Sequence, residues 1–332
     1  MSLLQLAQSL NLSKSTVSRA LNGYADVSPA TRERVIKAAK EMGYRPNPLA
    51  TRLAKGKTHA IATILPLSSS HTFITPAFSQ LLAGACDELS RYDYQLLVSS
   101  LPESVRELDL YQNYIDGGMA DGLFVMRTQK QDARIQLLQE RKFPVICHGS
   151  VDKNVPISTI DTDNYQAFYH ITEHYLQQGL DKIALFDGPQ PLTLSQQRCA
   201  GFMGAMHAYE QPMIQHWMQY LQLSEDAGYQ AAHNILQEKE RPQAILCAND
   251  TMAIGVISAC KKVGLRVGQD IFVSGYGNYD QGRYCSPPLT TISYDAYAVG
   301  KMMASMMMAQ LSNPDTEIQH KVVETQLIVR DS

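Results

Sequence analysis

The chain has 332 residues, of which 45% are hydrophobic and 18% charged, a composition typical of a folded protein with two or three domains. It contains no run of about eighteen apolar residues and begins on an amphipathic segment, so we expect a cytoplasmic protein that has no membrane partner. The six cysteines are scattered without metal-ligand spacing, which favours reduced thiols and neither a metal site nor a cofactor.

The formal net charge of −3 hides an uneven distribution of charge along the chain. Residues 1–58 hold ten Lys and Arg against three acidic residues, which gives +7 and leaves −10 for the remainder. A basic segment in front of an acidic body indicates a polyanionic partner for the first segment only.

Three short helices are predicted in the basic segment, over residues 3–10, 14–22 and 29–42. A serine before each helix, proline at the start of the third and Gly43 after it are the expected start and stop signals. The apolar residues that recur at helical spacing would form the core of a small bundle: Leu3, Leu6, Ala7, Leu12, Val17, Ala20, Leu21, Val27, Val35, Ala38 and Met42.

The second of these helices has the pattern of a DNA recognition helix. Val17, Ala20 and Leu21 face inward, which leaves small polar and basic side chains on the outer face. A helix presented in this way can enter the major groove and read base edges. The segment therefore predicts DNA binding.

A proline- and asparagine-rich link follows the bundle. Asn47 and Pro48 can cap and open one more helix, of only seven or eight residues. Because so short a helix is marginal in water, we expect it to become ordered only on binding a partner.

From Ala60 onward, apolar runs alternate with amphipathic segments. Buried parallel strands are predicted over residues 60–65, 94–99, 122–126, 144–147, 182–186, 244–247 and 271–275. Crossover helices are predicted over residues 77–92, 165–178, 228–238 and 252–263. The alternation begins again near Ile160, which indicates two doubly wound α/β lobes.

Ordered motifs along the chain resemble those of one family. They include residues 15–22 (STVSRALN), 31–35 (TRERV), 43–47 (GYRPN), 198–202 (RCAGF), 248–250 (AND) and 288–292 (PLTTI). On these motifs the chain resembles the lactose-repressor and galactose-repressor type of transcription factor along essentially its whole length.

The resemblance implies an all-α helix-turn-helix headpiece over residues 1–46, a hinge helix and linker over 47–57, and a ligand-binding core over 58–332. The core would be of the α/β periplasmic-binding-protein-like type, with two doubly wound lobes and a small ligand between them. Lobe one would cover about 58–159 and 292–320, and lobe two about 160–290 and 321–332, with a last strand over 322–329.

The resemblance also implies which residues bind DNA. Bases would be contacted by Lys14, Ser15 and Arg19, and phosphates by Thr16, Ser18, Asn22 and Ser28. Ala50 and Leu53 of the hinge helix would enter the minor groove, where an inserted leucine unstacks and kinks DNA. A homodimer would then require a double-stranded, pseudo-palindromic operator.

Nine residues are implied at the ligand: Phe73, Phe78, Arg127, His148, Arg198, Leu223, Asn249, Asp250 and Tyr276. Arg198 would clamp hydroxyls, and Asn249 can both donate and accept. Asp250 suits helix capping as well as ligand contact, and core packing suits the apolar members nearly as well. His148 serves equally well as a core or surface residue. The polar members suggest a neutral sugar effector. Residues 20–24 (ALNGY) and 147–150 (CHGS) resemble those of family members that sense α-glucosides, so an α-glucoside is favoured, and galactosides, sucrose and raffinose-type sugars remain open.

The leading hypothesis is a repressor of sugar-utilisation genes that a sugar releases from DNA. The rival is a corepressor-type regulator, in which a sugar phosphate or a purine promotes DNA binding. A plain sugar-binding protein would not need the basic segment. Residues 170–174 match the zinc-protease pattern His-x-x-Glu-His, but no third ligand is evident, so we do not expect an enzyme. The methionines at 302–308 are expected in a lobe core.

Overall fold

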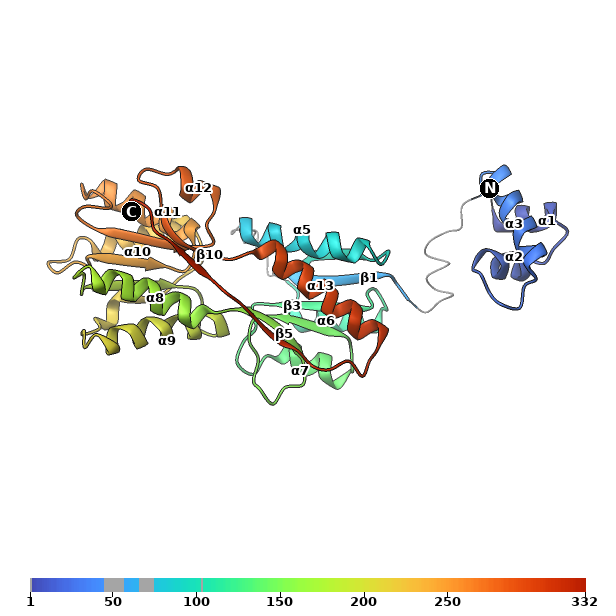
Figure 1. The fold of residues 1–332 in the computed structure, drawn as a ribbon, viewed down its shortest axis with the longest axis horizontal. Coiled ribbons are helices and arrows are strands. Elements are labelled where there is room, and N and C mark those ends of the chain that lie inside the picture. The colour runs from blue at the N-terminus through green and yellow to red at the C-terminus, as the bar shows by residue number, and fades with distance from the viewer. Residues whose placement is uncertain (1, 45–56, 66–74, 103) are drawn as a thin grey trace. The chain divides into compact units, whose positions relative to one another are not determined.

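The computed structural model describes residues 2–44, 57–65, 75–102 and 104–332. The chain divides into two compact units, Met1–His59 and Ala60–Ser332 (Figure 1). Within the described ranges, no helix has the length and apolar character needed to cross a membrane.

The first unit is a bundle of α1 (Leu3–Ser9), α2 (Lys14–Leu21) and α3 (Pro29–Glu41). A serine hydroxyl caps each helix by accepting a hydrogen bond from a backbone amide in the first turn. All eleven predicted core residues belong to the apolar cluster between the helices, together with buried Ala39. The prediction of an all-α headpiece is confirmed. The predicted hinge helix, with Ala50 and Leu53, lies outside the described residues.

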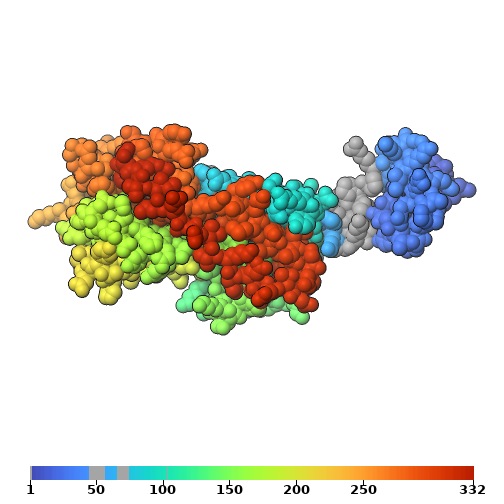
Figure 2. Space-filling model, in the orientation of Figure 1, coloured from blue at the N-terminus to red at the C-terminus, as the bar shows by residue number. Residues whose placement is uncertain are grey.

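The second unit contains two six-stranded sheets, each covered by helices. The first lobe has an all-parallel sheet in the order β11-β5-β4-β3-β1-β2. Its strands are β1 (Ala60–Leu65), β2 (Gln95–Ser100), β3 (Gly122–Met126), β4 (Val145–His148), β5 (Ser158–Thr162) and β11 (His320–Val323). Its helices are α5 (Pro76–Ser90), α6 (Glu107–Asp116), α7 (Ala133–Glu140) and α13 (Ala296–Ser312). Helices α5 and α13 pack along each other (Figure 1 and Figure 2).

The second lobe has the order β12-β10-β9-β8-β6-β7, with β12 antiparallel to β10. Its strands are β6 (Ile183–Asp187), β7 (Met218–Tyr220), β8 (Ala244–Cys247), β9 (Phe272–Tyr276), β10 (Thr290–Ser293) and β12 (Gln326–Ile328). Its helices are α8 (Asn164–Gln177), α9 (Thr193–Ala208), η1 (Gln215–Trp217), α10 (Glu225–Ile235), α11 (Asp250–Lys262) and α12 (Asp280–Tyr284). The central strands of both sheets are apolar runs because helices cover them on both faces.

In the described part of the chain, three connections pass between the lobes: β5 to α8, β10 to α13 and β11 to β12 (Figure 1). The predicted last strand over 322–329 is wrong as one element, because β11 pairs with β5 in the first sheet and β12 with β10 in the second. The predicted lobe limits shift for the same reason. Strand β5 keeps the chain in the first lobe to Thr162, and β10 keeps it in the second lobe to Ser293.

Candidate DNA-binding surface and ligand cavity

Helix α2 exposes the side chains predicted to contact bases. Val17 and Ala20 are buried against the bundle core, whereas Lys14, Ser15 and Arg19 are exposed. The helix therefore offers donors on the face that points away from the core, as base readout in the major groove requires.

The residues predicted to hold phosphates lie on α2 and beside it. Thr16, Ser18 and Asn22 are partly buried, and the Asn22 amide donates to the Ser18 carbonyl oxygen at 2.8 Å. Ser28 is the cap of α3, where its hydroxyl accepts from the Thr31 amide at 3.2 Å. The amino termini of α2 and α3 carry the partial positive charge that favours anions such as phosphate.

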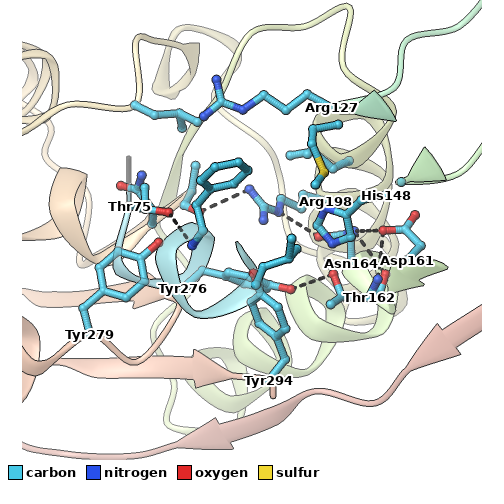
Figure 3. Close-up of a pocket in the computed structure, with 18 of the residues that line it drawn as sticks. Thr75, Arg127, His148, Asp161, Thr162, Asn164, Arg198, Tyr276, Tyr279 and Tyr294 are labelled. Carbon is cyan, nitrogen blue, oxygen red and sulfur yellow. Dashed lines mark hydrogen bonds between the residues drawn. The ribbon is translucent and has the colours of Figure 1, made fainter. Parts of the chain in front are cut away.

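The second unit has a cavity of about 130 Å³ that residues of both lobes line (Figure 3). Seven of the nine predicted ligand residues line it: Phe78, Arg127, His148, Arg198, Leu223, Asn249 and Tyr276. Phe73 lies outside the described residues. Most of the polar lining follows the carboxyl ends of parallel strands, where open α/β sheets place their ligands.

Arg198 of α9 is held by contacts on several sides. Its Nε donates to Asn164 Oδ1 at 3.0 Å, and its Nη1 donates to the Ala248 carbonyl oxygen at 3.1 Å. Its guanidinium carbon lies 4.4 Å from the ring centroid of Tyr276, and the buried carboxylate of Asp187 lies 3.7 Å from Nη1. The side chain is thus fixed and its charge is partly balanced by the protein itself.

Asn249 and Asp250 follow β8 but have different roles. Asn249 caps α11, with Oδ1 accepting from the Met252 amide at 2.8 Å, and its buried Nδ2 has no partner among the described residues. Asp250 does not line the cavity. Its carboxylate accepts from the Thr291 hydroxyl at 2.5 Å and from the Tyr279 amide at 2.6 Å. Asn249 therefore has a donor for a ligand, whereas Asp250 fixes the loop behind the cavity.

His148 and Asp161 face the cavity from the first lobe (Figure 3). Burial lowers the pKa of His148 to about 4, so the imidazole is neutral near pH 7, and its Nε2 has no partner within the described residues. Burial raises the pKa of Asp161 to about 6, against smaller lowering effects of its hydrogen bonds. Asp161 Oδ1 accepts from the Thr162 amide at 2.8 Å and from Asn164 Nδ2 at 3.2 Å.

Several residues that line the cavity were not predicted from the sequence. Asp161, Thr162 and Asn164 lie where β5 passes into α8, and Tyr279 and Tyr294 follow β9 and β10. Three polar residues at the end of a strand were the available signal, but β5 was not among the predicted strands. Tyr276 joins the two groups, because its hydroxyl donates to Thr162 Oγ1 at 2.8 Å.

The His-x-x-Glu-His pattern lies on α8, outside the cavity. His170 Nδ1 is 3.6 Å from Glu173 Oε2, and the His174 imidazole is hydrogen-bonded to Gln178. Among the described residues, no group of three His, Cys, Asp or Glu side chains is placed to hold a metal ion.

Two family models match the chain. The model described as bacterial regulatory proteins, lacI family, matches residues 2–47, and a periplasmic binding protein-like domain matches residues 172–332. The transcriptional regulator AglR of Rhizobium meliloti (strain 1021) is 31% identical over 99% of this chain and 93% of its own. The regulator CelR of Thermobifida fusca is 28% identical over 96% of this chain and 94% of its own.

Solved structures agree with these relatives along the whole chain. A lac repressor dimer bound to operator and the anti-inducer ONPF has a TM-score of 0.84 and 28% identity, and the match covers 100% of this chain and 98% of that chain. A complex of the regulator CelR with cellobiose has a TM-score of 0.77 and 27% identity, covering 100% and 99%. The chain therefore belongs to the lacI family of bacterial regulatory proteins, which are DNA-binding transcriptional regulators.

Proposed function

We propose that this protein is a transcriptional repressor of sugar-utilisation genes, which a neutral sugar bound between the core lobes releases from its operator. The observation that carries this proposal is the set of polar groups around the cavity. Asn249 Nδ2 and His148 Nε2 are buried without a partner among the described residues, and the Asp161 carboxylate lines the same cavity. Buried polar groups of this kind are costly unless a ligand satisfies them.

The charges around the cavity favour an uncharged ligand. Two guanidinium groups, of Arg127 and Arg198, line it together with the carboxylate of Asp161, and the Asp187 carboxylate lies behind Arg198. His148 adds no charge near pH 7 because of its lowered pKa. The two positive charges and the two negative charges cancel. Hydrogen-bond donors and acceptors that suit hydroxyl groups are therefore the main polar attraction for a ligand.

The size of the cavity supports coupling between the ligand and the lobes. Its volume of about 130 Å³ is below the roughly 300–1,000 Å³ typical of ligand sites. A disaccharide therefore requires a different spacing of the lobes, and a ligand that prefers one spacing shifts the equilibrium between conformations.

Among neutral sugars we favour an α-glucoside, which rests on the resemblance of the motifs. The CelR complex with cellobiose, at 27% identity, supports a glucose-containing disaccharide more generally. On DNA we propose a homodimer on a pseudo-palindromic site. The lac repressor dimer on its operator supports this arrangement. Lys14, Ser15 and Arg19 would contact bases, and Thr16, Ser18, Asn22 and Ser28 phosphates.

The test begins by selecting bound duplexes from a randomised DNA library with the full-length protein. The affinity for the selected duplex is then measured at fixed salt in the presence of maltose, sucrose, raffinose, cellobiose, galactosides, glucose 6-phosphate or purines. Release by a neutral disaccharide is the expected result. Tighter DNA binding with any ligand would instead support the corepressor-type regulator.

Arg198→Lys should abolish the sugar response and leave DNA binding without sugar intact, because lysine cannot replace a fork held by Asn164 and Ala248. Arg266→Lys is the matched control, since Arg266 is 70% exposed and pairs with Asp270 outside the cavity. Equal sugar responses in both variants would mean that the sugar does not bind in this cavity.

A further inference from the structure

The exposed face of the headpiece contains an ion pair between Arg19, which is predicted to contact a base, and Asp26, which has no predicted role. Arg19 Nη2 lies 2.6 Å from Asp26 Oδ2, and the two side chains are 52% and 50% exposed. Residues 1–58 contain only three acidic residues among ten basic ones, and one of the three lies against the arginine expected to contact a base. An ion pair this exposed adds little to folding stability, so stability alone does not account for it.

The loop after α2 places Asp26 beside Arg19. The Tyr24 amide donates to the Arg19 carbonyl oxygen at 3.1 Å, and Arg32 Nη2 donates to the Tyr24 carbonyl oxygen at 2.7 Å. Val27, next to Asp26, is buried in the bundle core. The backbone on both sides of Asp26 is therefore anchored, and its carboxylate lies at a defined place.

The guanidinium of Arg19 is contacted from two directions. Asp26 holds Nη2, and the guanidinium carbon lies 5.4 Å from the ring centroid of Tyr24. An arginine has five N–H donors, whereas the bidentate contact to guanine O6 and N7 uses two. One carboxylate contact thus leaves enough donors for a base while it limits the rotamers of the side chain.

We propose that Asp26 is a positioning residue for base recognition, which holds Arg19 ready to read one G·C pair in each half-site. This inference rests on the proposed function, because it requires sequence-specific DNA binding through α2. Asp26 also offsets one positive charge on this surface, which weakens attraction to phosphates of any sequence. Both effects raise the preference for the specific site over other DNA.

The experiment uses full-length Asp26→Asn and the duplex selected by the wild-type protein from a randomised library. Each G·C pair of the duplex is replaced in turn, and the loss of affinity is measured for the wild type and for Arg19→Ala. The pair that Arg19 reads is the one whose replacement weakens binding by the wild type but not by Arg19→Ala. Asp26→Asn should reduce discrimination at that pair by about two- to fivefold, in the range of exposed ion pairs, and leave discrimination at other pairs unchanged. In the Arg19→Ala background, Asp26→Asn should change no base preference.

Glu41→Gln is the matched control, because it removes one negative charge at the exposed end of α3, whereas the ion pair of Arg19 is with Asp26. It should tighten binding to every duplex alike. If Asp26→Asn behaves like Glu41→Gln and tightens binding to every duplex alike, Asp26 acts only through its charge and the proposal is overturned. A wild-type protein that selects no sequence would instead overturn the proposed function. Asp26→Glu, which keeps the charge, should recover part of the discrimination and separates positioning from any folding defect in Asp26→Asn.

Discussion

Burial shifts the pKa values of two cavity side chains in opposite directions. The pKa of Asp161 rises to about 6 and that of His148 falls to about 4, in each case chiefly because burial disfavours the charged form. Near pH 7 the cavity therefore offers a charged acceptor and a neutral imidazole. Between pH 6 and pH 4 both side chains are mainly neutral, and Asp161 has lost acceptor capacity.

The affinity for sugar should consequently fall as the pH drops through about 6. If only the ionised form of Asp161 accepts a ligand hydroxyl, one pH unit below its pKa costs about tenfold in affinity. Calorimetric titration of the releasing sugar between pH 5 and pH 8 measures this, and Asp161→Asn should give a flat profile. An unchanged fall in Asp161→Asn would assign the titration to another group, such as Asp187 or Asp250, whose pKa values burial also raises to about 6.

Loss of the fold does not explain that expected fall. A carboxyl whose folded pKa lies above its ordinary 3.8 is protonated more easily in the folded state. The contribution of Asp161 to the free energy of unfolding therefore rises as the pH falls from about 6 towards 3.8. Thermal melts over the same pH range serve as the control.

At this scale the resemblance predicted the cavity residues, several of which also follow apolar strands in the sequence. Arg127, Asn249 and Tyr276 lie directly after or at the end of such runs. Asp161 and Asn164 were missed because β5 alternates Ser, Thr, Ile, Asp and Thr instead of forming an apolar run. Asp250 was assigned equally to capping and to the ligand, since only the observed hydrogen bonds identify Asn249 as the cap.

At the scale of elements, glycine allows paired helices to pack with their backbones in contact. A Cβ placed on Gly84 of α5 would collide with the carbonyl oxygen of Tyr297 of α13, and one on Gly300 with that of Leu81. The same arrangement joins α8 to α9 at Gly201 and α10 to α11 at Gly255. Three helix pairs across both lobes thus depend on close backbone contact.

Gly84→Ala should lower the free energy of unfolding by about 1–3 kcal/mol, because the added methyl meets a backbone oxygen that cannot move without shifting α13. The better helix propensity of alanine, roughly 0.5–1 kcal/mol, offsets only part of this cost. Urea denaturation measures the change. Ala83→Ser, at an exposed position of the same helix, should change stability by less than about 0.5 kcal/mol. A Gly84→Ala protein as stable as the wild type would mean that the helices separate at little cost.

The elements predicted best were those with a strong local pattern. The methionine cluster is confirmed as lobe core: Met303 and Met307 are fully buried, and Met302 packs against the same cluster. Strands β7 and β12 have only three residues each and were not predicted separately, because so short a run carries no clear period. The division of residues 320–328 between two sheets depends on pairing partners far away in the chain.

On the scale of the whole second unit, the lobes touch beside the cavity through hydrogen bonds. The hydroxyls of Thr128 and Thr193 lie 2.7 Å apart, and the Thr193 amide donates to the Thr128 carbonyl oxygen at 2.9 Å. Gln197 Nε2 donates to Ser150 Oγ at 3.0 Å. Because Thr128 and Ser150 belong to the first lobe and the others to α9, these bonds favour the lobe spacing that encloses the small cavity.

Thr193→Val removes the hydroxyl and keeps the shape of the side chain and the backbone bond. The loss of one hydrogen bond costs about 1 kcal/mol. It should change the equilibrium constant between this lobe spacing and wider ones by roughly fivefold, in favour of the wider ones. A sugar that needs a wider spacing of the lobes than the small cavity allows should then bind the variant up to about fivefold more tightly, as measured by calorimetry. Thr316→Val is the matched control, since the Thr316 hydroxyl donates to the Asn313 carbonyl oxygen within the first lobe at 2.6 Å.

The direction of the change identifies the lobe spacing that the ligand prefers. Tighter sugar binding by Thr193→Val, with Thr316→Val unchanged, would mean that the ligand binds separated lobes, for which the small cavity gives a steric reason. Weaker binding would contradict that expectation and mean that the sugar stabilises the spacing held by Thr128. Coupling between two ligands is reciprocal. The factor by which sugar changes the affinity of the variant for DNA must therefore equal the factor by which DNA changes its affinity for sugar. The four affinities to measure are those for sugar with and without DNA and those for DNA with and without sugar. Comparing them between the variant and the wild type connects the hydrogen bonds between the lobes to release from DNA.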